Sequence, residues 1–230
     1  MGVIIAFYFT KYGERLNRNQ DEKEVLNQIY FELQDNLIDL RQDLLIHQIG
    51  LEANLRVLKF LDTKGPLTDS LVMDFYWMTK DEYIFGNTSG YENLKSFGIG
   101  LIKDDYLRNL ITLVYNHNFP RLIKGNTLYP DINEFLNPYF KDHFKVNRDT
   151  SLKYTLNLND SIQVKYPREI GFGVQKFVGY IPMSTEELLV DEEFRFLINK
   201  TLEYRLYKFQ FYQRCIENVK KTIEQIELSQ

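Results

Sequence analysis

Three histidines are the residues whose type best suits metal ligation or proton transfer. A metal site on a helix needs a second ligand one turn away, and neither Glu nor His stands four residues after His47. His143 lies beside Asp142 in a charged stretch typical of a surface, and His117 lies at the end of an expected helix, where a partly positive ring suits the helix dipole. The histidines therefore predict structural or surface roles and no bound metal.

The other reactive groups also lack the partners that catalysis requires. The Gly-Phe-Gly run at 171–173 has neither the third glycine nor the Lys-Ser/Thr pair of a phosphate-binding loop. Adjacent carboxylates at 104–105 and 186–187 would point about 100° apart on a helix, so charge at a helix start explains them better than acid–base catalysis. Cys215 is the only cysteine, which excludes an intramolecular disulfide. We therefore expect a protein that is not an enzyme and holds no cofactor.

The segment from 85 to 102 is the best candidate for a binding site. It is rich in glycine and small polar residues, and it carries Tyr91, Ser96 and Phe97. Tyr115 would add a further aromatic ring from the next expected helix. Two interpretations are open: a tight corner between helices, where small residues permit close packing, and part of a groove for a peptide or a small ligand.

The composition indicates a folded domain that does not bind nucleic acid. Apolar residues make up 44% of the 230 residues and charged residues 26%. The net charge is −4, with acidic and basic residues interspersed, so no basic surface for phosphates is expected. The 17 Phe and 16 Tyr suit a broad, partly exposed core or a contact surface.

Two long amphipathic helices must position the candidate residues. Apolar residues recur at three- and four-residue steps from 21 to 61, which predicts one long helix that the Lys-Gly-Pro run at 64–66 ends. A second apolar series recurs from 198 to 226, after a capping-box signature at 184–187. Packing of one stripe against the other predicts an antiparallel hairpin. A coiled-coil homodimer is the alternative, because each stripe could also pack against a second copy.

The chain between these helices is predicted to form a small cap. A second capping box, Ser89 to Glu92, opens one of its short helices. Alternating apolar and polar residues from 152 to 166, with a turn at Asn159-Asp160, predict a β-hairpin. The expected fold is therefore mainly α, a long helical hairpin with a small helical cap and one β-hairpin. Its expected parts are a long N-terminal helix at 11–65, the cap at 66–183 and a long C-terminal helix at 184–230.

The first residues form an uncharged apolar run, Gly2 to Phe9, that ends at Thr10-Lys11. A membrane-spanning helix needs about 20 apolar residues, so this run is too short to span by itself. Three interpretations are open: a buried N-terminal turn, an interfacial anchor, and the C-terminal part, at 1–10, of a truncated transmembrane helix. Tyrosines followed by basic residues, as at a membrane exit, favour the third.

Two stretches carry a resemblance to known proteins: residues 2–26, and residues 87–98 with the helix that follows. They are similar to a family of uncharacterised bacterial proteins, mostly from the Bacteroidetes, that carry one transmembrane helix before a charged linker and a long helix. The chain departs from the family's pattern with Tyr12-Gly13 in place of Asn-Trp. The resemblance implies a single-span inner-membrane protein and no activity. A basic N-terminus, as in that family, would place the domain on the periplasmic side, which is the expectation, whereas Lys11, Arg15, Arg18 and Lys23 favour the cytoplasmic side.

The expected function is assembly or signalling through protein contacts, by a membrane-anchored domain that is not an enzyme. The alternative is an extracytoplasmic sensor of a small ligand or peptide, which predicts a closed pocket lined by residues such as Tyr91, Phe97 and Tyr115. The expected partners are the membrane, through the N-terminal helix, and a protein.

Overall fold

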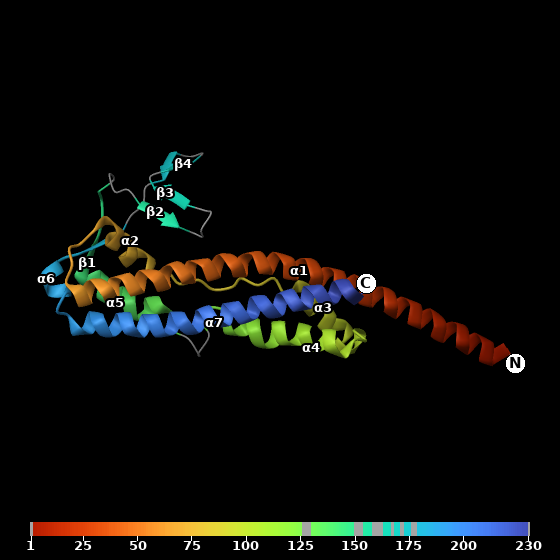
Figure 1. Cartoon of the computed structure of the whole chain (residues 1–230). Helices are drawn as coiled ribbons and strands as arrows, with labels where there is room; N and C mark the ends of the chain where they lie inside the picture. Colours follow the sequence, from red (N-terminus) through yellow and green to blue (C-terminus); the bar gives the residue numbers. More distant parts are fainter. Residues whose placement is uncertain are drawn as a thin grey trace. The chain divides into compact units, whose positions relative to one another are not determined.

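The computed structural model describes residues 2–125, 130–149, 154–157, 163–166, 168–170, 173–175 and 179–229. Two long helices dominate it, α1 (Gly2–Thr63) and α7 (Glu192–Ser229). They pack side by side as the predicted hairpin, which confirms the mainly α fold class (Figure 1). The helix α1 ends where the sequence predicts, since Lys64 after it adopts a positive φ of 49° and Gly65-Pro66 follow.

Polar contacts between the two long helices show that they are antiparallel. Asp62 near the end of α1 pairs with Arg195 near the start of α7, with 2.6 Å between Oδ1 and Nη1. Tyr30, much earlier on α1, donates from its hydroxyl to Glu227 near the end of α7 at 2.8 Å. The residue numbers therefore rise on one helix as they fall on the other.

The chain divides into two compact units, and each long helix contributes to both. Unit 1 comprises residues 1–41, 84–123 and 211–230, and unit 2 comprises residues 42–83 and 124–210. The further elements of unit 1 are the helices α3 (Ser89–Phe97) and α4 (Asp105–Leu113), the 3₁₀ turns η1 (Ile99–Leu101) and η3 (Phe119–Arg121), and the π-helical turn η2 (Val114–Asn118).

The described residues of unit 2 add short helices and three antiparallel strand pairs to the long helices. Its helices are α2 (Asp69–Trp77), α5 (Ile132–His143) and α6 (Thr185–Leu188). Its strand pairs are β1 (Phe144–Val146) with β6 (Tyr180–Pro182), β2 (Tyr154–Asn157) with β3 (Gln163–Tyr166), and β4 (Arg168–Ile170) with β5 (Gly173–Gln175). Its core is rich in aromatic rings, with Phe75, Phe144 and Phe194 in mutual contact.

The predicted β-hairpin over 152–166 is present as β2 and β3, which pair from Tyr154 opposite Tyr166 to Asn157 opposite Gln163. The turn predicted at Asn159-Asp160 lies outside the described residues. The β1–β6 and β4–β5 pairs were not predicted, because strands of three residues are too short for a pattern of alternation to stand out.

The predicted start of the long C-terminal helix differs from the observed one. Ser184 accepts a hydrogen bond from the Glu187 amide, as the capping box predicts, but the helix it caps is the short α6. The long helix α7 starts only at Glu192, where the Asp191 carboxylate accepts from the Phe194 amide at 3.0 Å. The signature at 184–187 therefore predicts a helix start correctly, but this start belongs to α6 and not to the long helix α7.

The expectation of a membrane span is wrong. Within the described part of the chain, no helix is both long enough and apolar enough to cross a bilayer. Residues 2–10 are instead the first turns of α1, and the same helix carries Lys11, Glu14 and Arg15 directly after them. The expected location, a single span in the inner membrane with a periplasmic domain, is therefore corrected.

Candidate functional site

In unit 1, the segment that contains α3 runs antiparallel along the first half of α1. The Asn36 side chain brackets the backbone of Asn87, donating to its carbonyl at 2.8 Å and accepting from its amide at 2.9 Å. Further along, the Asn93 side chain donates to Gln28 at 2.8 Å. These amide contacts fix the register between α3 and α1, so the side chains of both helices border one surface.

The buried carboxylate of Glu32, on α1, binds the N-terminus of α3. It accepts from the Gly90 amide at 2.6 Å, the Ser89 hydroxyl at 3.1 Å and the Tyr115 hydroxyl at 2.5 Å. Thr88 precedes the helix and makes no side-chain capping bond. A carboxylate at a helix N-terminus satisfies a free amide and interacts favourably with the helix dipole. Glu32 therefore replaces the predicted capping box, which does not form.

The structure brings two of the four predicted site residues together. The rings of Tyr91 and Tyr115 are both buried and stack 4.4 Å apart, almost parallel. Burial and the neighbouring Glu32 carboxylate raise the pKa of Tyr115, and the Tyr91 hydroxyl has no hydrogen-bond partner within the part of the chain that the structure describes. Ser96 and Phe97 are exposed, and Ser96 donates back to the Asn93 carbonyl.

An open groove of about 540 Å³ lies between α1 and α3 above the Glu32 carboxylate. None of the residues that line it is basic, and two of them, Glu32 and Asp35, carry carboxylates. Phe31 borders this groove with 64% of its surface exposed. The complete lining is Gln28, Phe31, Glu32, Asp35, Asn87, Ser89 and Asn93.

A second groove, of about 340 Å³, lies between α1 and α7 in the same unit. Its lining residues on α1 include Ile38, which is 53% exposed. Residues seven apart on a helix lie on the same face, so Phe31 and Ile38 form one apolar line between the two grooves. We call this line, Phe31 and Ile38 with the groove residues on either side, the α1 ridge. The second groove is lined by Gln34, Leu37, Ile38, Arg41, Lys220, Ile223 and Glu224.

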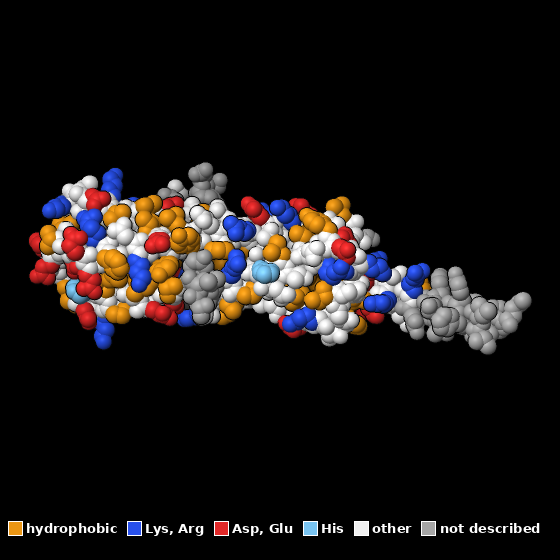
Figure 2. Space-filling model, turned by 90° about the horizontal axis from the view of Figure 1, so that it is seen from below, with side chains coloured by type: hydrophobic (Ala, Val, Ile, Leu, Met, Phe, Trp, Pro, Cys, Tyr) orange, Lys and Arg blue, Asp and Glu red, His pale blue; other side chains and the backbone are white. Residues whose placement is uncertain are grey.

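Exposed apolar side chains occur elsewhere on the molecule too. On the face drawn in Figure 2, they are interspersed with acidic and basic side chains over the described residues. Single exposed apolar residues are normal on a protein surface and need no special explanation. The α1 ridge differs because its two apolar side chains are aligned and each borders a groove.

Unit 2 contains a buried polar cluster that the sequence did not predict. The Arg205 guanidinium is fully buried and donates to the carbonyl oxygens of Met78 at 2.7 Å, Lys80 at 2.6 Å and Trp77 at 3.4 Å. A Cβ added to Gly50 of α1 would lie 2.3 Å from its Nη1, so only glycine leaves room for it there. Burial lowers the pKa of Arg205 to about 10, which leaves it charged at neutral pH.

Lys208, one turn further along α7, completes this cluster. Its Nζ lies 2.6 Å from both carboxylate oxygens of Asp81, which also accepts from the Tyr83 hydroxyl at 2.8 Å. His47 of α1 is buried with its Nε2 3.1 Å from the Glu82 carbonyl, as the structural role predicted for it requires. Burial first, then Arg205 and Lys208, holds the pKa of His47 well below its usual range. The cluster joins the segment after α2 to both long helices.

One sequence signal could have revealed this cluster. The apolar series predicted on α7 includes Leu206, which the structure leaves exposed. Thr201, Arg205 and Lys208 recur at three- and four-residue steps in that stretch, and all three are buried. A polar series with helical spacing inside an apolar stripe indicates a buried polar contact whose partners lie elsewhere in the chain.

The described residues offer little for metal or thiol chemistry. They include no group of three or more His, Cys, Asp or Glu that could hold a metal ion. Cys215 is buried on α7, and burial raises the pKa of its thiol to about 12. A thiol with so high a pKa is a poor nucleophile at neutral pH, because the thiolate is the reactive form.

Comparison with known proteins adds nothing to this geometry: no family model, no curated protein and no solved structure matches the chain. The function is therefore inferred from the residues of the chain and their geometry.

Proposed function

We propose that this chain is a non-enzymatic interaction protein whose unit 1 binds a basic, amphipathic segment of a partner polypeptide along the α1 ridge. Assembly or signalling through protein contacts is the role that this binding would serve. The observation that carries the proposal is the alignment of two exposed apolar side chains, Phe31 and Ile38, between two grooves.

The apolar part of the proposed contact is supplied by the ridge itself. Phe31 and Ile38 expose 64% and 53% of their surfaces. Apolar surface gains about 25 cal/mol for each Å² that is removed from water, so apolar side chains of a partner would pack favourably against both. The grooves on either side leave room for that packing, as in the binding of an amphipathic helix to an apolar groove.

The charge beside the ridge selects the partner's polar residues. Glu32 and Asp35 line the first groove, and Asp39 is exposed one turn beyond Asp35. None of the lining residues of that groove is basic, so a Lys or Arg of the partner would meet only negative charge there. The second groove contains Arg41 and Lys220 beside Glu224, so the partner's basic side chains are expected at the first groove. A cation placed over the ring of Phe31 would gain a further contribution from its π-electrons. A basic segment is therefore favoured over an acidic one.

The groove is also preorganised, which favours binding. Glu32 is held by three donors, and the contacts of Asn36 and Asn93 fix α3 against α1. A rigid surface loses little conformational entropy when a partner binds, so more of the contact energy remains as affinity.

Fluorescence anisotropy of the full chain with labelled peptides tests the proposal. We expect an amphipathic peptide of Leu and Lys to bind, and its counterpart with Glu in place of Lys to bind at least about tenfold more weakly. Phe31→Ala and Asp35→Asn should each weaken binding of the Lys peptide, by roughly three- to thirtyfold, because each removes one of the two proposed contributions.

Phe97→Ala is the matched control, since Phe97 is a phenylalanine of the same unit with 51% exposure that lines neither groove. An equal loss on Phe97→Ala, or equal binding of the Glu peptide, would refute the proposal. Sedimentation velocity tests whether a second copy of the chain occupies the ridge in place of a partner. If the chain is a dimer and Phe31→Ala converts it to a monomer, a second copy covers the ridge.

A further inference from the structure

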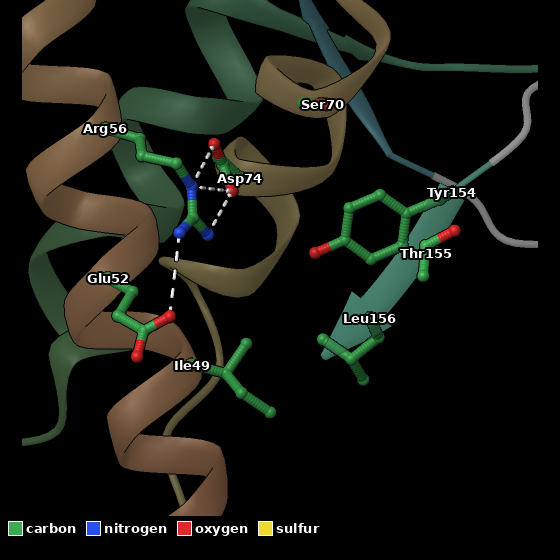
Figure 3. A pocket seen from close by; sticks show the side chains of 8 residues that line it. All are labelled: Ile49, Glu52, Arg56, Ser70, Asp74, Tyr154, Thr155 and Leu156. Carbon is green, nitrogen blue, oxygen red and sulfur yellow. Dashed lines mark hydrogen bonds and ion pairs between the residues drawn. The ribbon is translucent and has the colours of Figure 1, made fainter. Parts of the chain in front are cut away.

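Unit 2 contains a pocket with one polar and one apolar end, formed by α1, α2 and β2. Its volume is about 160 Å³, similar to a cavity of about 150 Å³ known to admit benzene. It therefore has room for a ligand of roughly six to eight non-hydrogen atoms. The lining residues, all drawn in Figure 3, are Ile49, Glu52, Arg56, Ser70, Asp74, Tyr154, Thr155 and Leu156.

An arginine between two carboxylates forms the polar end. Arg56 binds Asp74 through two nitrogens, with Nε 2.9 Å from Oδ2 and Nη2 2.8 Å from Oδ1. The Asp74 side chain is almost fully buried, whereas that of Glu52 is half exposed. Burial raises the pKa of Asp74, and the Arg56 guanidinium opposes that rise. This pair is therefore a fixed wall of the pocket rather than a mobile surface ion pair.

The second carboxylate, Glu52, is the group left incompletely neutralised. Its Oε2 lies 3.6 Å from Arg56 Nη1, which is too long for a hydrogen bond. Arg56 supplies one positive charge against the two negative charges of Glu52 and Asp74, so these three side chains carry a net charge of −1. A cation that entered the pocket could form a shorter contact with Glu52 than Arg56 does.

The opposite wall comes from β2. The hydroxyl of Tyr154 points from the strand toward the side on which Arg56 and Asp74 lie (Figure 3). Burial and the Asp74 charge raise the pKa of Tyr154 to about 12, so it stays a neutral hydroxyl. At the other end, Ile49 and Leu156 present apolar side chains to each other across the pocket.

We infer that this pocket binds a small primary amine, with the ammonium group at Glu52 and a compact apolar body between Ile49 and Leu156. The site lies wholly within unit 2 and does not depend on binding at the α1 ridge. The net charge of −1 selects against carboxylates, and the volume selects against ligands much larger than a six-membered ring.

The experiment uses three ring compounds of similar size and different charge: cyclohexylamine, cyclohexanol and cyclohexanecarboxylate. Each is titrated into the isotopically labelled full chain and followed by amide chemical shifts. We expect saturable shifts near residues 49–56, 70–74 and 154–156 with cyclohexylamine, at least about tenfold weaker affinity for cyclohexanol, and no saturation with the carboxylate.

Two substitutions locate the site. Glu52→Gln should weaken cyclohexylamine binding about tenfold or more, and Leu156→Trp should abolish it by filling the apolar end. Glu92→Gln is the control, because Glu92 is an exposed carboxylate that also pairs with a basic residue, Lys95, but lies in unit 1. Far-ultraviolet circular dichroism confirms that each variant folds, so a loss of binding cannot come from unfolding.

Tighter binding of the carboxylate would overturn the inference, since it would make Arg56 the recognising group. Shifts that appear equally with all three compounds, or that survive Leu156→Trp, would also overturn it. Loss of peptide binding at the α1 ridge leaves this inference untouched, so failures of the two proposals are distinguishable.

Discussion

Arg205 is a buried cation whose hydrogen-bond acceptors are backbone carbonyl groups, in place of the water that would surround it on the surface. Its Nη2 donates to the carbonyl oxygens of Met78 and Lys80 after the end of α2, with the Trp77 carbonyl further away at 3.4 Å. Its guanidinium lies against Gly50 of α1, and its Nε and Nη1 have no hydrogen-bond partner among the described residues. The last carbonyl groups of a helix lack partners within the helix, so a donor from another element stabilises the helix end. Buried charges are tolerated only where such partners are fixed in place. Arg205 and Gly50 therefore act as a pair.

The Gly50→Ala substitution tests this pairing. The added Cβ would lie 2.3 Å from Nη1 and 2.5 Å from Cζ of Arg205, whose position is fixed by its acceptors. We expect the free energy of unfolding to fall by about 2 kcal/mol, because the buried Arg205 side chain must shift to a strained conformation. Urea denaturation measures the change.

Gly13→Ala is the matched control on the same helix, since a Cβ there meets no atom within 4 Å. Alanine favours a helix over glycine by about 1 kcal/mol, so this variant should be as stable as the parent chain or more stable. Equal destabilisation by both substitutions would mean that Arg205 does not require glycine at position 50.

At the scale of elements, α3 depends on a residue far away in the sequence. Glu32 of α1 accepts from the amide and hydroxyl groups at the start of α3. A Cβ at Gly90 would lie 3.1 Å from the backbone nitrogen of Ile29, so glycine allows the two helices to approach closely. The attachment therefore combines a charged cap with close backbone packing.

Replacing Glu32 by Gln keeps the shape of the side chain and removes its charge. We expect unfolding to require about 1–2 kcal/mol less, because hydrogen bonds to a charged group are stronger than those to a neutral one. We also expect faster amide hydrogen exchange over residues 89–94 than in the parent chain. Glu92→Gln is the control, because Glu92 is exposed and pairs with Lys95 three residues later. Unchanged exchange at α3 in Glu32→Gln would show that the carboxylate is not needed.

At the scale of the whole molecule, stability is linked to pH through His47. Its pKa in the folded chain is well below the usual value, first because of burial and then because of Arg205 and Lys208. The acidic side chain facing it is Asp81, whose Oδ1 lies 3.9 Å from Nδ1. Below about pH 6.5, His47 is therefore protonated in the unfolded chain and stays neutral in the folded chain. The free energy of unfolding therefore falls as the pH is lowered through that range.

We expect His47→Gln to reduce this pH dependence. Between about pH 7.5 and about pH 5.5, the parent chain should lose roughly 1 kcal/mol more of its unfolding free energy than the variant does. Urea denaturation at both pH values measures the difference. His143→Gln is the control, because His143 is exposed. If the two variants show the same slope, another group controls the pH dependence.

The sequence by itself determined the elements whose signals are local. The apolar spacing between 21 and 61 predicted α1, the Lys-Gly-Pro run predicted its end, and the carboxylates at 104–105 predicted the helix start that α4 has there. Helix periodicity, capping and turn chemistry act between neighbouring residues, so they can be recognised without the fold. The same local evidence suggested a membrane span, but no helix among the described residues is long and apolar enough to form one.

Only the tertiary structure decided which distant residues form ion pairs, hydrogen bonds and close packing contacts with one another. It places Glu32 beneath α3, Arg205 against Gly50, and Asp74 beside Arg56, and it separates Phe97 from the buried pair Tyr91 and Tyr115. A local pattern cannot identify the partners of these residues, because the partners come from elsewhere in the chain. The energy of a buried charge depends on those partners, which the fold alone brings within hydrogen-bonding distance.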